Sequence, residues 1–186
     1  MIGRTIRRDD RRQRIDAGRM NRSNAPPDLH VAQHEGLVQV HRALSAALRE
    51  IASTPADVAV DVLVPKALGA ARFLLGHHHA ESTVLFPGLR RLGRLRSSDV
   101  AVLDACDRDH HALHALCERL TANASASHPA VREIVVLAGE LEAAFSAHVA
   151  TEETALAPDQ LRAMISREGL EEIGRELEAS RRRFSP

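Results

Sequence analysis

The sequence predicts an all-α protein, an antiparallel up-down four-helix bundle with an additional C-terminal helix. From residue 29 onwards, apolar residues recur at intervals of three and four, which places them on one face of a helix. No segment shows the period of two that a half-buried strand requires. Breaks rich in Pro, Gly and Ser divide residues 29–158 into four long helical segments with short links, a pattern typical of a bundle.

The first two helices form the first half of the predicted bundle. The first carries its inward stripe over residues 34–51 and ends before Pro55. The second opens near Pro65 and is interrupted at Pro87, after which a short helical turn reaches Gly93. The pattern of residues 56–64 fits either a short helix or an extended link.

The starts and ends of the remaining three helices are predicted from similar signals. The third begins near Asp99, where two serines precede an acidic residue, and ends before the Ser-rich segment 125–129. The fourth opens after Pro129 and ends at Pro158. A weaker fifth helix is predicted from about Pro158 to Arg182. Cys106 and Cys117 fall on the inward face of the third helix, 11 residues apart, so they are expected to be inert buried thiols.

Composition limits the broad class of protein. Residues 1–28 hold eight arginines and little apolar content, so a flexible N-terminal arm is predicted before the bundle (29–158) and the C-terminal helix (159–186), which packs on the bundle or extends from it. Translation from Met20 is an alternative explanation of that arm. The 25 basic and 25 acidic residues balance, which argues against a nucleic-acid binder. No apolar run reaches 18 residues and no signal peptide is evident, so we expect a cytoplasmic protein without a membrane span.

Polar residues occupy positions that should face the core of all four bundle helices. They are His41, His77, Glu81, His110, His148 and Glu152. One such histidine could be satisfied by a hydrogen bond, but six buried polar groups in register would each cost a few kcal/mol if left unpaired. The group must therefore be satisfied together, and a bound metal does this.

An internal repeat supports the same interpretation. The spacing His77-x3-Glu81-x5-Pro87 recurs as His148-x3-Glu152-x5-Pro158, and the segment around His41 matches that around His110. The two halves of the bundle therefore look like two copies of one metal-binding unit. Residues four apart share a helix face, so a histidine and a glutamate at this spacing can both reach one metal, and two facing glutamates can bridge two metals. His114, four residues after His110, completes the candidate set.

These residues resemble those of hemerythrin and, more closely, of bacterial hemerythrin-like proteins of the HHE cation-binding family. The resemblance covers about residues 34–158, and its most specific segments are His77–Pro87 and His148–Glu153. It implies an oxo- or hydroxo-bridged pair of iron ions held by His41, His77, Glu81, His110, His114, His148 and Glu152. Three histidines would then serve one iron and two the other, which leaves an open position for O2, hydrogen peroxide or NO.

Several assignments stay open at this stage. His78 with Glu81 is an alternative to His77, although His78, His79 and His111 are expected on the flanks or the surface. Hemerythrin itself spaces its last ligands so that Glu153 would replace Glu152. His34 fits a core, pocket or ligand role. Zinc or manganese could replace iron, because imidazole binds several metals.

The function expected from the resemblance is that of a non-haem di-iron protein binding O2 or a reduced oxygen species. Peroxide decomposition of the catalase type would make it an enzyme, a point that the sequence leaves open. The alternatives are a carrier or sensor of O2 or NO without turnover, and an iron-sensing, iron-storing or structural bundle. The chain has no Tyr and no Trp, which weighs against a tyrosyl-radical oxidase. The oligomeric state is not predicted.

Overall fold

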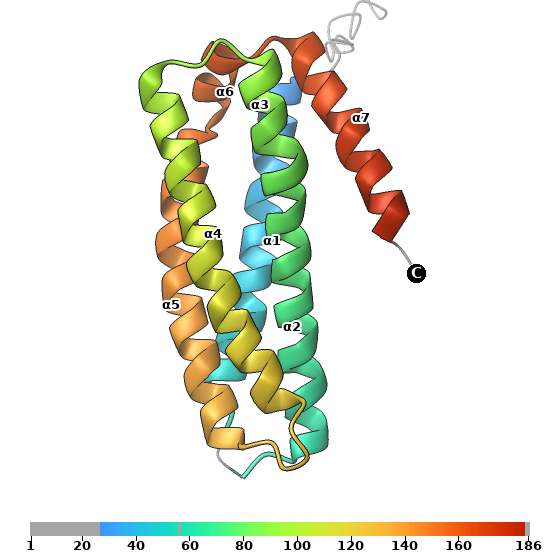
Figure 1. The fold of residues 1–186 in the computed structure, drawn as a ribbon, viewed down its shortest axis with the longest axis vertical. Helices are drawn as coiled ribbons and strands as arrows, with labels where there is room; N and C mark the ends of the chain where they lie inside the picture. Colours follow the sequence, from blue (N-terminus) through green and yellow to red (C-terminus); the bar gives the residue numbers. More distant parts are fainter. Residues whose placement is uncertain (1–26, 56, 185–186) are drawn as a thin grey trace, which may run out of the picture.

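The computed structural model describes residues 27–55 and 57–184, and its main body is a four-helix bundle (Figure 1). The bundle helices are α1 (Leu29–Ala52), α2 (Val60–Ala80), α4 (Ser97–Ala124) and α5 (Val131–Ala155). Consecutive helices run in opposite directions, with the α1–α2 and α4–α5 links at one end of the molecule. Residues 27–55 and 57–184 contain no strand. The predicted all-α, up-down fold is confirmed.

The second bundle helix begins before Pro65, and its α-helical part ends at Ala80, before the interruption predicted at Pro87. It begins at Val60 and carries Pro65 inside it, because Leu63 is fully buried and draws the first turn into the core. At its other end the chain stays helical through a π-helical segment, η1 (Glu81–Leu85), into α3 (Phe86–Leu92). The Phe86 amide donates to the Glu81 carbonyl oxygen, five residues earlier, which is the wide turn that defines a π-helix. The interruption predicted at Pro87 is therefore a change of helix type rather than a break.

The C-terminal part is helical, as predicted, but it is divided where a single continuous helix was expected. It forms two helices, α6 (Pro158–Met164) and α7 (Arg167–Phe184), separated by Ile165 in an extended conformation. The carbonyl groups at this break bond elsewhere: Met164 accepts from the Arg94 amide at 2.6 Å, and Ile165 accepts from His30 Nε2 at 3.1 Å. These contacts tie the break to the α3–α4 link and to the start of α1. From there α7 leads away along the outside of the bundle (Figure 1).

The interior consists of two apolar clusters separated by one polar layer. The larger cluster fills the end of the bundle that holds the α1–α2 link, and it includes Leu44, Leu74, Leu113, Leu141 and Phe145. The smaller one fills the other end, beneath α6 and α7, and includes Leu37, Leu85, Phe86, Cys106, Leu156 and Ile173. Between them lie the buried polar side chains of His41, His78, Glu81, His110, His148 and Glu152. Close packing on both sides keeps bulk water away from this layer.

Acidic side chains fix the starts of two bundle helices. The Asp28 carboxylate accepts hydrogen bonds from the His30 and Val31 amides at the start of α1. At the start of α4 the Asp99 carboxylate accepts from the Arg96 amide at 2.8 Å, so the cap predicted near residues 97–99 begins one residue earlier.

Two expectations from the sequence need qualification. The helix α5 is long and apolar enough to cross a membrane, whereas we expected no such helix. This is weak evidence for a span, because a core helix passes the same test, and α5 buries His148 and Glu152 in the bundle interior. The predicted arginine-rich arm lies almost wholly in residues 1–26, outside the described residues. The domain boundaries therefore stay a prediction.

Candidate metal centre

The polar layer contains a first group of potential metal ligands between α1, α2 and α5. One donor atom from each of His41, His77, Glu81 and Glu152 lies within 4.8 Å of the others. His41 Nε2 is 3.2 Å from Glu152 Oε2, and His77 Nε2 is 3.2 Å from Glu81 Oε1. Each histidine thus faces a different glutamate. We call this group the two-histidine cluster.

A second group lies beside it, towards α4. Donor atoms of His78, Glu81, His110 and His148 also lie within 4.8 Å of one another. His110 Nε2 is 3.5 Å from Glu81 Oε2 and 3.3 Å from His148 Nε2. We call this group the three-histidine cluster. The two clusters share Glu81, whose two carboxylate oxygens face different clusters.

The second glutamate also connects the two clusters. The same Glu152 oxygen that faces His41 lies 3.4 Å from His148 Nε2. Glu81 and Glu152 therefore stand between the two groups of histidines, from η1 and α5 respectively. This is the arrangement in which two facing carboxylates can bridge two metal ions.

His78 is the main correction to the sequence interpretation. We expected it on the flank of its helix, but it is fully buried and belongs to the three-histidine cluster, while His77 belongs to the other. Consecutive residues point about 100° apart around a helix. Because the inward face of α2 contacts both α1 and α4, His77 can face His41 on one side while His78 faces His110 on the other. The neighbouring His79 is exposed, as expected.

His114 falls outside both clusters. Its ring lies one turn further along α4 than His110, 5.5 Å from the His78 ring between centroids, and it is only partly buried. The structure therefore brings six of the seven predicted ligands together and leaves His114 beside them, while His78 takes an inward position. His34 also lies outside the clusters, on α1, and His111 is exposed.

The geometry separates the two candidate glutamates of α5. Glu152 is completely buried and faces the histidines, whereas the side chain of Glu153 is 30% exposed. Glu153 instead accepts a hydrogen bond at 3.0 Å from Nδ1 of His41. Because a carboxylate only accepts, the proton is on Nδ1, and the lone pair of His41 Nε2 is left facing the cluster.

Two residues that sequence reasoning missed stand behind His110. Its Nδ1 lies 2.9 Å from the hydroxyl oxygen of Ser82, which in turn donates to Asp107 at 3.1 Å. The signal in the sequence was the position of Ser82 directly after Glu81, which corresponds to Glu153 after Glu152 in the other half of the repeat.

Many buried polar atoms of the layer have no hydrogen-bond partner among the described residues. They include both carboxylate oxygens of Glu81 and Glu152, both ring nitrogens of His78, and Nε2 of His41 and His77. Each such atom would cost one to a few kcal/mol if it stayed unpaired. Imidazole nitrogens and carboxylate oxygens are donors that divalent transition metals accept. The residues therefore fit a metal site.

The electrostatics favour a bound cation. Burial lowers the pKa of His77 to about 3 and that of His110 to about 4, and burial also lowers the pKa of His78. These rings are thus neutral, the form that binds metal. Burial, together with the nearby Glu152 carboxylate, raises the pKa of Glu81 well above its usual value. Burial opposes ionisation of Glu152 too, but the nearby imidazole rings of His148 and His41 hold its pKa below the usual value.

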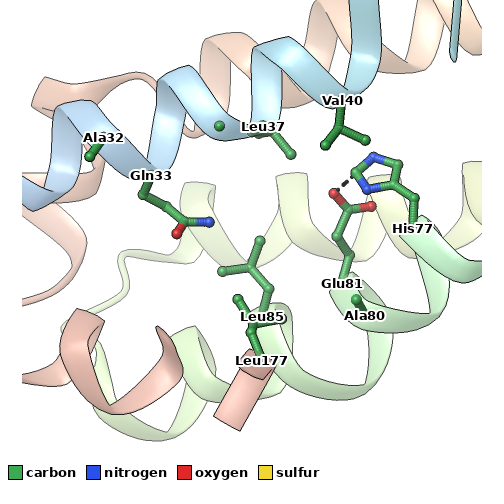
Figure 2. A pocket seen from close by; sticks show the side chains of 10 residues that line it. Ala32, Gln33, Leu37, Val40, His77, Ala80, Glu81, Leu85 and Leu177 are labelled. Carbon is green, nitrogen blue, oxygen red and sulfur yellow. Dashed lines mark ion pairs between the residues drawn. The ribbon is translucent and has the colours of Figure 1, made fainter. Parts of the chain in front are cut away.

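A small cavity reaches the two-histidine cluster from outside the bundle. It has a volume of about 150 Å³ and lies between α1, the end of α2 and α7. Figure 2 shows His77 and Glu81 at one end of it, with a dashed line for the 3.2 Å contact between His77 Nε2 and Glu81 Oε1, and Gln33 and Leu177 towards the other. Apart from these two cluster residues and Gln33, its lining is apolar or glycine. The cavity suits a ligand of a few atoms.

The two cysteines lie where the sequence placed them. Cys106 and Cys117 are both buried and unbonded to each other, and burial raises the pKa of each thiol to about 12. A thiol with such a pKa is protonated at neutral pH, so both behave as inert core residues.

Comparison with known protein families agrees with this centre. The family model of the hemerythrin HHE cation-binding domain matches residues 26–159, which include all four bundle helices and both clusters. The chain belongs to this family of cation-binding proteins, and two adjacent His/Glu clusters in its core could each hold a metal ion. No curated protein and no solved structure gives a significant match.

Proposed function

We propose that the protein is a non-haem di-iron protein that binds O2 or a reduced oxygen species in its bundle core. The observation that carries this proposal is the set of buried, unpartnered imidazole and carboxylate atoms in two adjacent clusters that share Glu81. A single ion would leave one cluster unsatisfied. Two ions would satisfy both.

The proposed ligands are distributed unequally between the two ions. His41 and His77 would hold the first ion, and His78, His110 and His148 the second, with Glu81 and Glu152 between them. Five histidines and two glutamates are thus retained, as the family resemblance implies, but His78 takes the place assigned to His114. The clusters observed in the layer support this distribution.

The donor set favours iron over zinc. A structural zinc ion is satisfied by four tetrahedral ligands, whereas here five histidines surround a shared pair of carboxylates, seven side chains in all. Mixed imidazole and carboxylate donors of this kind are typical of bridged iron pairs in helical bundles. When bound, such a pair supplies reversible binding of oxygen species and the electrons for their reduction.

The surrounding residues select the ligand and protect the site. The 150 Å³ cavity ends at His77 and Glu81, so it leads to the cluster with fewer histidines, where a bound ion would have room for a further ligand. Its largely apolar lining suits a small neutral molecule such as O2, hydrogen peroxide or NO. The apolar clusters on both sides of the layer exclude bulk water, which would tune the redox potential of a bound iron pair and slow its autoxidation.

Addition of hydrogen peroxide to the iron-loaded protein separates turnover from simple binding. If the protein decomposes peroxide, O2 is released in a ratio of one molecule per two of peroxide over many cycles. A spectral change without O2 release would favour a carrier or sensor. Iron-loaded protein with neither response would contradict the proposed oxygen chemistry and leave a structural or iron-storage role.

A further inference from the structure

The two proposed metal sites are supported by unequal groups behind their histidines. In one half of the repeat, Glu153 follows the second bridging glutamate and accepts directly from His41 Nδ1 at 3.0 Å. In the other half, the residue that follows Glu81 is Ser82, and its hydroxyl lies 2.9 Å from His110 Nδ1. A carboxylate thus stands behind one histidine, and a hydroxyl group stands at the equivalent place behind the other.

The hydroxyl group leads to a carboxylate one step further away. Ser82 Oγ donates to Asp107 Oδ1 at 3.1 Å. Because a hydroxyl group has one proton and the carboxylate can only accept, the Ser82 oxygen accepts from His110 Nδ1–H. The lone pair of His110 Nε2 is therefore left facing Glu81 and the rest of the three-histidine cluster.

An arginine fixes the far end of this chain. Arg90 of α3 donates to Asp107 Oδ2 at 3.0 Å and to Asp104 at 2.8 Å. The second oxygen of Asp107 is therefore occupied, and its first is left for Ser82. Ser82 belongs to the π-helical segment η1, which begins at Glu81, and its side chain faces α4. The whole arrangement connects α3, η1 and α4 behind a single ring.

We propose that Ser82 and Asp107 form a relay that positions His110 for metal binding, so that the second metal depends on a hydroxyl-linked carboxylate where the first depends on Glu153 directly. Both are positioning residues that act through His110. The inference rests on the proposed metal pair. Partners of this kind hold a metal-binding ring in one tautomer and orientation, and their loss costs about 10- to 100-fold in metal affinity.

Cobalt(II) is a suitable probe, because sites with nitrogen and oxygen donors bind it more tightly than ferrous iron and its visible bands report coordination. We would titrate the wild-type protein and the Ser82→Ala variant with Co2+ and follow these bands. Wild-type protein should bind two Co2+ per chain. In Ser82→Ala the affinity of one of the two binding steps should fall by about tenfold. Only the visible bands that appear during that step should shift.

Three further variants separate the relay from a general structural effect. Ser82→Thr keeps the hydroxyl group and should restore wild-type binding. Thr83→Ala makes a similar change one residue away, where the hydroxyl group only donates to the His79 carbonyl oxygen, and should leave both steps unchanged. Asp107→Ala should weaken the same step in the wild-type background and have little further effect in Ser82→Ala, because both act through one path.

Two results would overturn the relay. One is wild-type affinity for both ions in Ser82→Ala, and the other is an Asp107→Ala effect that persists undiminished without the hydroxyl group. Thermal unfolding of each metal-free variant identifies a loss caused by misfolding, which alanine in a helix should not produce. Wild-type protein that binds no Co2+ would instead remove the proposed function, and the relay with it.

Discussion

The ring of His78 stacks on the ring of His110, with centroids 3.9 Å apart and planes inclined by 12°. Both side chains are buried, and both face the layer between the two apolar clusters. Two neutral rings packed this closely bring the donor atoms of α2 and α4 to one side of Glu81. The contact places His78 beside His110 in the three-histidine cluster, whereas His114, expected there from the sequence, lies outside it.

Replacing His78 should remove one metal ion. We expect His78→Gln to bind about one ion per chain in place of two, because the three-histidine cluster loses a donor while His41 and His77 keep theirs. The affinity loss should exceed the roughly 10- to 100-fold expected for an outer partner. Metal content after dialysis measures it. His79→Gln is the matched control, since His79 is the adjacent, exposed histidine, and equal losses in both variants would refute the assignment.

Filling the cavity should slow the access of small ligands. Gly36 lies in α1 and lines the cavity, and a Cβ atom there would meet nothing within 4 Å. We expect Gly36→Leu to fold at least as stably as wild type, because leucine is the better helix former by nearly 1 kcal/mol, while azide binds to the iron-loaded protein several-fold more slowly in stopped-flow absorbance. Gly69→Leu on α2, which lines a different groove, should bind azide at the wild-type rate. Unchanged rates in Gly36→Leu would mean that ligands enter elsewhere.

The close approach of α7 to α3 should not tolerate a methyl group. A Cβ atom at Gly88 would lie 2.6 Å from Cγ1 of the fully buried Ile173. We expect Gly88→Ala to lower the free energy of unfolding by about 1–3 kcal/mol, the usual cost of overpacking, in chemical denaturation. Gly174→Ala, where a Cβ atom meets nothing, should be neutral or stabilising. A neutral Gly88→Ala would show that α7 can move away at no cost.

Acid should weaken the contact between the start of α1 and α6. The Arg162 guanidinium, at 2.6 Å, together with the capped amides, holds the pKa of Asp28 at about 2. As pH falls, Asp28 is therefore protonated in the unfolded chain before it is protonated in the folded protein. The stabilisation is complete at neutral pH and disappears as pH falls from about 4 to about 2. Asp28→Asn should thus be less stable than wild type at pH 7, with a smaller difference at pH 3, in urea unfolding. Asp159→Asn removes a more exposed partner of the same arginine and should change stability less.

The sequence predicted the fold and most of the layer because both depend on one periodicity. The spacing of Leu37, His41 and Leu44 places all three on one face of α1, whatever the helix packs against. All three residues are buried, as predicted. The same stripe rule failed at His78, because it assumes a single inward direction for each helix. A bundle helix packs against two adjacent helices. In α2, His77 faces α1 and the next residue, His78, faces α4.

Other features of the structure depend on contacts between distant residues, which the spacing of apolar residues does not predict. The split between α6 and α7 is fixed by hydrogen bonds from Arg94 and His30, which are distant in the sequence. The position of Ser82 after Glu81 marks the residue but not its partner, because the pairing with Asp107 joins two helices across 25 positions. The start of α2 lies before Pro65 because burial of Leu63 favours a further helical turn there, although Pro65 has no amide proton for a helix hydrogen bond.

The central claim is that the two clusters hold a pair of iron ions that react with oxygen species. The most direct test is the metal content of the protein together with its visible spectrum in the anaerobic, oxidised and peroxide-treated states. We expect about two irons per chain and near-ultraviolet oxo-bridge bands that change when peroxide is added. A colourless protein that contains zinc or no metal and stays folded would contradict the account and leave a histidine-rich structural bundle.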